Sequence, residues 1–152
     1  KLGEGTRRVN AVLKTMNQTL SVWDNVMKGL RESEYLEVFL KDGAELLAKH
    51  KAKVLDIAAK AVPTVFEGYD CLVVACHPKF TSDVGHALAK KCGTFGIVTS
   101  IDIVAKQVVY SLRSIEDFDV SEIAKLHGGG GHKNAAGFSK PLLVDSIGGR
   151  RI

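Results

Sequence analysis

The spacing of apolar residues changes at Pro63, and this change divides the chain into two parts. Before Pro63, apolar side chains recur every three or four residues along two stretches, which is the period of an amphipathic helix. Proline cannot continue a helix, so the second stretch ends there. The pattern predicts a helical hairpin with helices over residues 7–30 and 35–61. Asp42-Gly43 interrupts the second stretch and could bend or break that helix.

Residues after Pro63 have the pattern of short strands separated by turns. Thr64–Phe66 and Cys71–Cys76 flank Glu67-Gly68-Tyr69-Asp70, which predicts a strand, a turn and a second strand. The second strand is apolar on both faces, so we expect it to be central and covered by helices. Further strands are expected over residues 95–100, 107–112 and 137–139.

Two helices are expected among these strands. Thr81 or Ser82 can cap a helix that continues to Lys91. Asp119-Val120-Ser121-Glu122 has the pattern of a capping box and opens a short second helix, which ends at Gly128. The predicted fold class is therefore α/β: a helical hairpin over residues 1–62, a mixed-sheet α/β domain over 63–145 and a frayed tail over 146–152.

The composition is that of a globular protein and excludes a membrane span. Hydrophobic residues make up 45% of the chain and charged residues 25%, and the longest purely apolar run, Cys71–Cys76, is far shorter than a bilayer requires. The sequence begins at Lys1 without Met or a signal peptide, so we expect a piece of a longer protein. Cys71, Cys76 and Cys92 lack CxxC spacing and are expected to be reduced, mostly buried thiols of a cytoplasmic protein.

The charge balance gives weak support for a nucleic-acid partner. The formal net charge is +4, which favours binding to polyanions. The dense basic block is confined to Lys49–Lys53, and a run of that kind is typical of a solvated helix face.

Four consecutive glycines, Gly128 to Gly131, stand between the second predicted helix and the last strand. Ordering them is entropically costly, and their N–H groups could form a concave nest for an anion such as phosphate. His132 and Lys133 would add donors at its rim. A flexible linker is the alternative, but the Ala-Ala-Gly that follows indicates tight packing.

Known motifs fit this segment poorly. A P-loop needs Gly-Lys-Ser/Thr after its glycines, whereas His132 follows Gly131, and the dinucleotide fingerprint fails at Lys133. His127 and His132 have no second pair with ligand spacing, so zinc is not expected.

Ser111-Leu112-Arg113-Ser114 closes the strand that precedes the second helix. Arginine flanked by hydroxyl groups can hold a phosphate through two parallel hydrogen bonds. The alternative is a surface arginine paired with Glu116 or Asp117.

Three blocks together resemble the DHH phosphoesterase family. They are Ser111–Ser114, Asp119–Ala124 and Gly128–Phe138, and their order is similar to that in the DHH-associated C-terminal domain of the nanoRNase and 3′-phosphoadenosine 5′-phosphate phosphatase branch. The match is weaker over residues 1–60. The resemblance implies a domain that binds the phosphate of a nucleotide or short RNA through Ser111, Arg113, Gly128, Gly129, Gly130, Gly131, His132, Lys133 and Asn134.

The Asp-His-His sequence after which the family is named does not occur here. In the family it helps to bind two divalent metals, usually manganese, in an N-terminal domain. The resemblance therefore implies that this chain is the substrate-binding half of a hydrolase, with no metal or catalytic residue of its own and no activity alone. Its partners would be its own DHH domain and a short RNA, 3′-phosphoadenosine 5′-phosphate or a cyclic dinucleotide, hydrolysed by a phosphodiesterase, exonuclease or phosphatase reaction.

Two other interpretations stay open. One is a nucleic-acid-binding module like the tail of alanyl-tRNA synthetase, and the other is part of an exopolyphosphatase-like enzyme. The helices over 7–30 and 35–61 could also form a homodimer interface.

Overall fold

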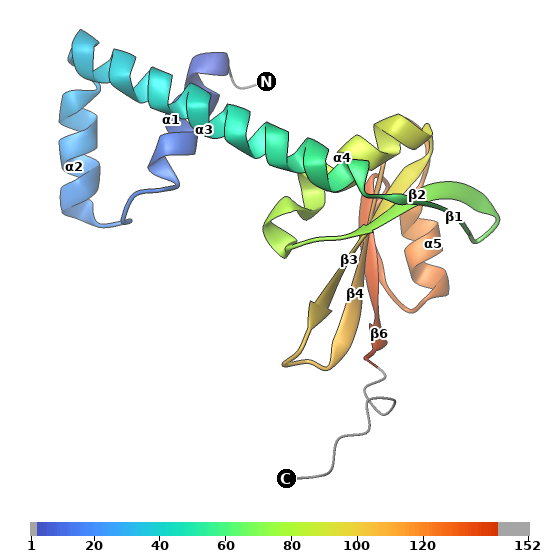
Figure 1. The fold of residues 1–152 in the computed structure, drawn as a ribbon. Coiled ribbons are helices and arrows are strands. Elements are labelled where there is room, and N and C mark those ends of the chain that lie inside the picture. Colours follow the sequence, from blue (N-terminus) through green and yellow to red (C-terminus); the bar gives the residue numbers. More distant parts are fainter. Residues whose placement is uncertain (1–2, 143–152) are drawn as a thin grey trace. The chain divides into compact units, whose positions relative to one another are not determined.

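The computed structural model describes residues 3–142, and the chain divides into two compact units, Lys1–Lys53 and Val54–Ile152 (Figure 1). The expected tail over 146–152 lies outside the described residues. Within residues 3–142, no helix combines the length and the apolar content that crossing a bilayer requires.

The first unit contains α1 (Glu4–Leu13), α2 (Leu20–Gly29) and the first part of α3 (Ser33–Ala59). The prediction of one helix over 7–30 is wrong, because the chain leaves the helix after Leu13 and starts another at Leu20. Polar side chains stabilise both ends of this break. Thr15 donates to the carbonyl oxygen of Val12 at 2.7 Å, and Thr19 caps α2.

The second predicted helix is continuous, since α3 runs for 27 residues through Asp42-Gly43 without a break. Gly43 is buried against the backbone of α1, where a Cβ would lie 2.1 Å from the carbonyl oxygen of Arg8. The glycine therefore permits a close helix–helix approach rather than ending the helix. The small core of this unit contains Val12, Val26 and Phe39.

The second unit is built on a six-stranded sheet with the order β1-β2-β3-β4-β6-β5 (Figure 1). The strand β2 pairs with β3 in parallel, and the other neighbours are antiparallel. The bounds are β1 Val62–Phe66, β2 Tyr69–Ala75, β3 Phe95–Asp102, β4 Gln107–Ser114, β5 Gly130–His132 and β6 Ala135–Pro141. The predicted α/β class with a mixed sheet is confirmed.

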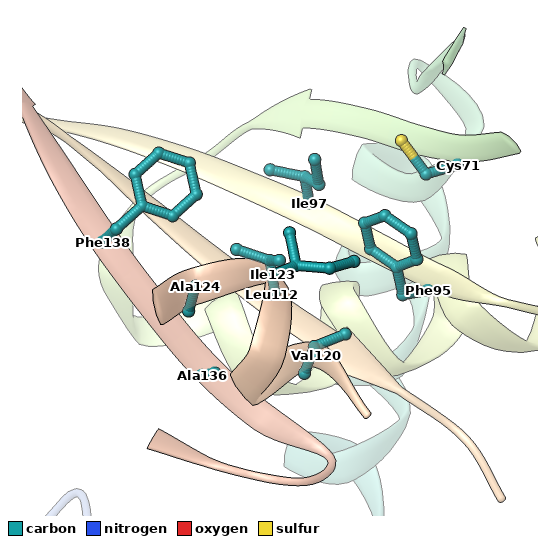
Figure 2. Close-up of a cluster of buried hydrophobic side chains, with 9 residues drawn as sticks. All are labelled: Cys71, Phe95, Ile97, Leu112, Val120, Ile123, Ala124, Ala136 and Phe138. Atoms are coloured by element: carbon teal, nitrogen blue, oxygen red, sulfur yellow. The ribbon is translucent and has the colours of Figure 1, made fainter. Parts of the chain in front are cut away.

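Two helices cover opposite faces of this sheet, because successive strand residues point to opposite sides. The helix α5 (Val120–Leu126) packs on the face that carries Phe95, Ile97 and Leu112, and Figure 2 shows this cluster. The helix α4 (Thr81–Cys92) packs on the other face, which carries Leu72 and Val98. Cys71 belongs to the first cluster and Leu72 to the second, so β2 is apolar on both faces as predicted.

The helix ends agree only in part with the predictions. Asp119 caps α5 by accepting a hydrogen bond from the Ser121 N–H at 2.9 Å, and Gly128 follows the helix end with φ +79°. Neither Thr81 nor Ser82 caps α4, however. A 3₁₀ turn over Pro78–Phe80 leads directly into α4, whose first residue is Thr81, so the cap position falls on Phe80 and has no side-chain hydrogen bond.

Candidate functional site

The register of β4, β6 and β5 places predicted site residues on one face of the sheet. Arg113 lies opposite Ala135, which in turn lies opposite His132. In the same way, Ser111 lies opposite Gly137, which lies opposite Gly130. Paired residues on neighbouring strands share a face, and Leu112 between the two β4 residues belongs to the α5 side. These rows therefore lie on the α4 face of the sheet.

The helix α4 leaves part of that face open. It packs on β2, β3 and β4, whereas α5 packs on β4, β5 and β6 from the opposite side. A Cβ built on Gly130 would meet nothing within 4 Å. The α4 face over β6 and β5 is therefore a shallow floor of small residues, which we call the glycine floor: Gly130, Ala135 and Gly137. A sugar–phosphate backbone could approach such a floor closely.

Arg113 stands between α4 and the glycine floor. Its Nη2 donates to Ser82 Oγ at 3.4 Å and its Nη1 donates to the carbonyl oxygen of Leu112 at 2.9 Å. A guanidinium has five N–H donors, so these two bonds leave further donors for a ligand. The ion pair with Glu116 or Asp117 that the sequence left open is not formed within residues 3–142. Asp117 instead accepts from Lys133 at 2.7 Å, and this hydrogen bond holds the pKa of its carboxyl group below the usual value.

Two open hollows flank Arg113. The first, which we call the Ser82 hollow, has a volume of about 570 Å³, and its lining includes Ser82, Ile101, Ile103 and Ser111. The second, which we call the His86 hollow, has a volume of about 540 Å³, and its lining includes His86, Lys90, Glu116 and Asn134. Both hollows share Arg113, so one guanidinium can serve ligand groups on either side.

The run of glycines differs from both the nest and the linker that the sequence suggested. The N–H of Gly128 donates to the carbonyl oxygen of Lys125 at 3.0 Å, and the N–H of Gly129 donates to that of Ala124 at 2.9 Å. This is the Schellman pattern of a helix C-terminus. Gly130 and Gly131 belong to β5. The first two N–H groups are thus already used, and the second pair of glycines supplies an edge strand.

Lys133 and Asn134 form the tip of the β5–β6 hairpin and hold the neighbouring turn. The Asn134 side chain donates to Ser114 Oγ at 3.0 Å and to the carbonyl oxygen of Glu116 at 3.2 Å. Lys133 makes the ion pair with Asp117. Both residues therefore have a structural role in positioning the end of β4, and Asn134 also lines the His86 hollow.

His127 is separated from this site by the sheet. It stacks on Phe138, a residue of the α5-side core, with ring centroids 4.4 Å apart, and its Nε2 lies 2.9 Å from Glu67 Oε1. His127 and His132 therefore do not converge on one ligand. Within residues 3–142, no three His, Cys, Asp or Glu side chains are grouped so that they could hold a metal ion.

The sequence interpretation did not single out His86 and Lys90 as site residues. Together with Ser82 they are spaced by four residues, which places all three along one side of α4. That spacing was the available signal. What the sequence alone could not show is that this side of α4 borders Arg113.

The family model described as "DHHA1 domain" matches residues 70–146, about half of the chain. The chain belongs to the DHHA1 domain family. The matched region contains the second unit from β2 onward, including Arg113, both hollows and the glycine floor.

One curated relative and two solved structures are similar to this DHHA1 protein. Uncharacterized protein R106 of Acanthamoeba polyphaga mimivirus is 29% identical over 121 residues, which cover 76% of this chain and 29% of that protein. The chain thus spans less than a third of the length of that relative. The structure of a pGpG-specific phosphodiesterase, PggH, from Vibrio cholerae has a TM-score of 0.49 and 17% identity, covering 68% of this chain and 37% of that one. An exopolyphosphatase-related protein from Bacteroides fragilis has a TM-score of 0.40 and 18% identity, covering 70% and 37%.

Proposed function

We propose that this DHHA1 domain binds the phosphate group of a nucleotide or short oligonucleotide within a DHH-family phosphoesterase. The observation that carries the proposal is the position of Arg113, whose guanidinium stands between two hollows and beside an open floor of glycine backbone. A planar guanidinium can bind a phosphate through two parallel hydrogen bonds, which fixes the orientation of the ligand as well as its position.

The neighbouring residues suit this role. Ser111 lies two residues before Arg113 on the same face, and its hydroxyl group can donate to a phosphate oxygen. His132 lies in the same row as Arg113, across the glycine floor. Since the floor carries no large side chain, a sugar–phosphate backbone can lie between these donors. Holding a substrate in this way lowers the barrier of a reaction by positioning it, without a catalytic group on this domain.

The reaction itself is assigned to another part of the intact protein. We propose that a DHH domain holds the divalent metals, which supply activation of a water for attack on phosphorus. The Asp-His-His sequence is not among these residues. The 152-residue chain would then bind nucleotides without hydrolysing them. Membership of the nanoRNase and 3′-phosphoadenosine 5′-phosphate phosphatase branch is part of the same proposal.

A nucleotide suits the site better than inorganic polyphosphate. The Ser82 hollow combines hydroxyl groups with the apolar side chains of Ile101 and Ile103, which are 60% and 70% exposed. A nucleobase or ribose can bury such apolar surface, whereas a chain of phosphates has none to bury. Adenosine 5′-monophosphate should therefore bind more tightly than inorganic triphosphate.

The test is titration of the full-length protein with these two ligands, using wild type, Arg113→Ala, Arg113→Lys and Lys125→Ala. Charge-assisted hydrogen bonds contribute about 1.5–3 kcal/mol, so Arg113→Ala should weaken nucleotide binding roughly 10–150-fold. Arg113→Lys keeps the charge but loses the planar fork, so its affinity should be intermediate. Lys125 carries a positive charge on α5, across the sheet, and its removal should have no effect. Equal affinity of wild type and Arg113→Ala would contradict the proposal.

A further inference from the structure

One side of α4 carries a row of polar residues that continues beyond Arg113. Ser82, His86 and Lys90 are spaced by four residues, so they follow one another by about 6 Å along the helix axis. Ser82 is the member that hydrogen-bonds Arg113. His86 and Lys90 lie further along the helix and line the second hollow together with Arg113.

His86 and Lys90 point away from the core and have no partner in this part of the molecule. Both are exposed, whereas Gly85, Leu88 and Ala89 face the sheet and are buried. Neither side chain makes a hydrogen bond or an ion pair with any of residues 3–142. Their donors are therefore available to a ligand in the His86 hollow.

The charges in the His86 hollow favour an anion. Lys90 and Arg113 carry two positive charges, and the carboxylate of Glu116 carries one negative charge, so the fixed charge is 2 − 1 = +1 before any protonation of His86. Asn134 fixes the backbone of Glu116 by donating to its carbonyl oxygen, which keeps the turn in place beside the hollow. The hollow has about 540 Å³, which is ample for a phosphate group.

We infer that His86 and Lys90, with Arg113, form a second phosphate subsite. This inference rests on the proposed function and deepens it, because it names the substrate class: nucleotides that carry two phosphate groups, one bound beside Ser82 and Ser111 and the other in the His86 hollow. Arg113 lies between the two subsites and contacts both phosphates. The second phosphate can be a terminal monoester or the next internal diester of a longer strand.

The probes are three short RNAs that differ only in phosphate groups and length. The dinucleotide ApA has one internal phosphodiester, pApA adds a terminal phosphate, and the trinucleotide ApApA adds a second internal phosphodiester. Each is titrated by calorimetry against the full-length protein in the presence of a chelator, which prevents metal-dependent hydrolysis during the measurement. The quantity compared is the gain in affinity that the second phosphate gives over ApA.

The variants isolate the subsite from the general charge of the helix. His86→Ala/Lys90→Ala removes both proposed donors. Lys91→Ala is the matched control, because Lys91 also lies in the last turn of α4 but does not line the hollow. Glu116→Gln removes the opposing negative charge while the backbone carbonyl that binds Asn134 stays in place. Circular dichroism verifies that each variant is folded.

In wild type, the terminal phosphate of pApA should raise affinity over ApA by about 10-fold or more, the lower end for a charge-assisted hydrogen bond. The double variant should reduce that gain to about 2-fold or less, Lys91→Ala should leave it unchanged, and Glu116→Gln should increase it. The slope of log Kd against log salt for pApA should also become shallower by about 0.7 for each phosphate that the variant no longer neutralises. A gain of equal size with ApApA would identify the internal diester as a source, and a gain restricted to pApA would identify the monoester.

Two results would overturn the inference, and they are distinguishable. If the gain from the second phosphate is the same in wild type and in the double variant, while Arg113→Ala still weakens ApA binding, the second subsite is wrong and the proposed function stands. If ApA does not bind, or if Arg113→Ala leaves its affinity unchanged, both are wrong.

Discussion

The aliphatic stem of Arg113 lies directly against Gly85 of α4. A Cβ at position 85 would be 2.7 Å from Arg113 Cγ and 3.0 Å from its Cβ, closer than ordinary side-chain contacts. The glycine therefore lets the helix approach β4 closely enough for the guanidinium to reach Ser82. The site depends on a residue that a ligand would not touch.

Gly85→Ala is expected to displace Arg113 and to weaken nucleotide binding several-fold while the protein stays folded. Alanine is favoured over glycine inside a helix by about 0.5–1 kcal/mol, which offsets part of the cost of the close contact. Urea unfolding and calorimetric titration of the full-length protein would measure the two effects separately. Unchanged affinity in the folded variant would show that the Gly85 contact does not position Arg113.

Gly129 and Gly130 are adjacent but should respond oppositely to alanine. A Cβ on Gly129 would lie 2.1 Å from the carbonyl oxygen of Gly137, whereas one on Gly130 would meet nothing within 4 Å. Gly129→Ala should lower the free energy of unfolding by about 1–3 kcal/mol, the usual cost of overpacking. Gly130→Ala should leave stability nearly unchanged but weaken nucleotide binding, because its methyl group would stand on the glycine floor. Equal stability losses in the two variants would contradict this view of the hairpin.

Cys71 should behave as a buried thiol with no part in catalysis. Burial, with smaller contributions from Cys92 and Asp70, raises its pKa from 9.0 to about 11. A group whose pKa is raised by folding holds its proton more tightly in the folded state, so stability is constant below about pH 9 and falls as the pH rises toward 11. In Cys71→Ala this alkaline decrease should be smaller. Rapid alkylation of Cys71 in the folded protein at neutral pH would contradict the assignment.

Asp119 should contribute to the loss of stability in acid. Its hydrogen bonds from Ser121, at the start of α5, hold the pKa of its carboxyl group below the usual 3.8. A group whose pKa is lowered by folding stabilises the protein above its ordinary pKa, and this contribution is lost as the pH falls through the folded-state pKa. Asp119→Asn keeps the capping oxygen without the charge, so unfolding measured across this range should depend less steeply on pH. An identical acid profile in wild type and variant would disprove the role.

Local signals in the sequence were sufficient for much of the fold. The apolar run in residues 71–76 and the turn before it predicted the β1–β2 hairpin, and the capping residues of α5 predicted both of its ends. Failures occurred where a tertiary contact decided the outcome. Gly43 looked like a break in a helix but is needed for packing against α1, and the glycines of β5 gave no strand pattern because their ladder partner is β6.

The candidate site was predictable to the same extent. Ser111, Arg113 and Gly130 could be named from their sequence blocks, and the register places them on one face of the sheet. His86 and Lys90 could not, because their relation to Arg113 depends on the crossover between β2 and β3, which brings α4 alongside β4. A spacing of four residues on an exposed helix side is common, and it gained meaning only from that neighbour.

The most direct test is to locate a bound nucleotide by backbone amide shifts in the ¹⁵N-labelled 152-residue chain during titration with adenosine 5′-monophosphate. We expect the largest shifts at Ser111, Arg113, Gly130 and Gly137, on the α4 face of the sheet. Residues of α5 such as Ile123 and Ala124, on the other face, should stay unchanged. Saturable binding with its largest shifts on the α5 face, or no shift at Arg113 and the glycine floor at any nucleotide concentration, would contradict the assignment of this face as a phosphate-binding site.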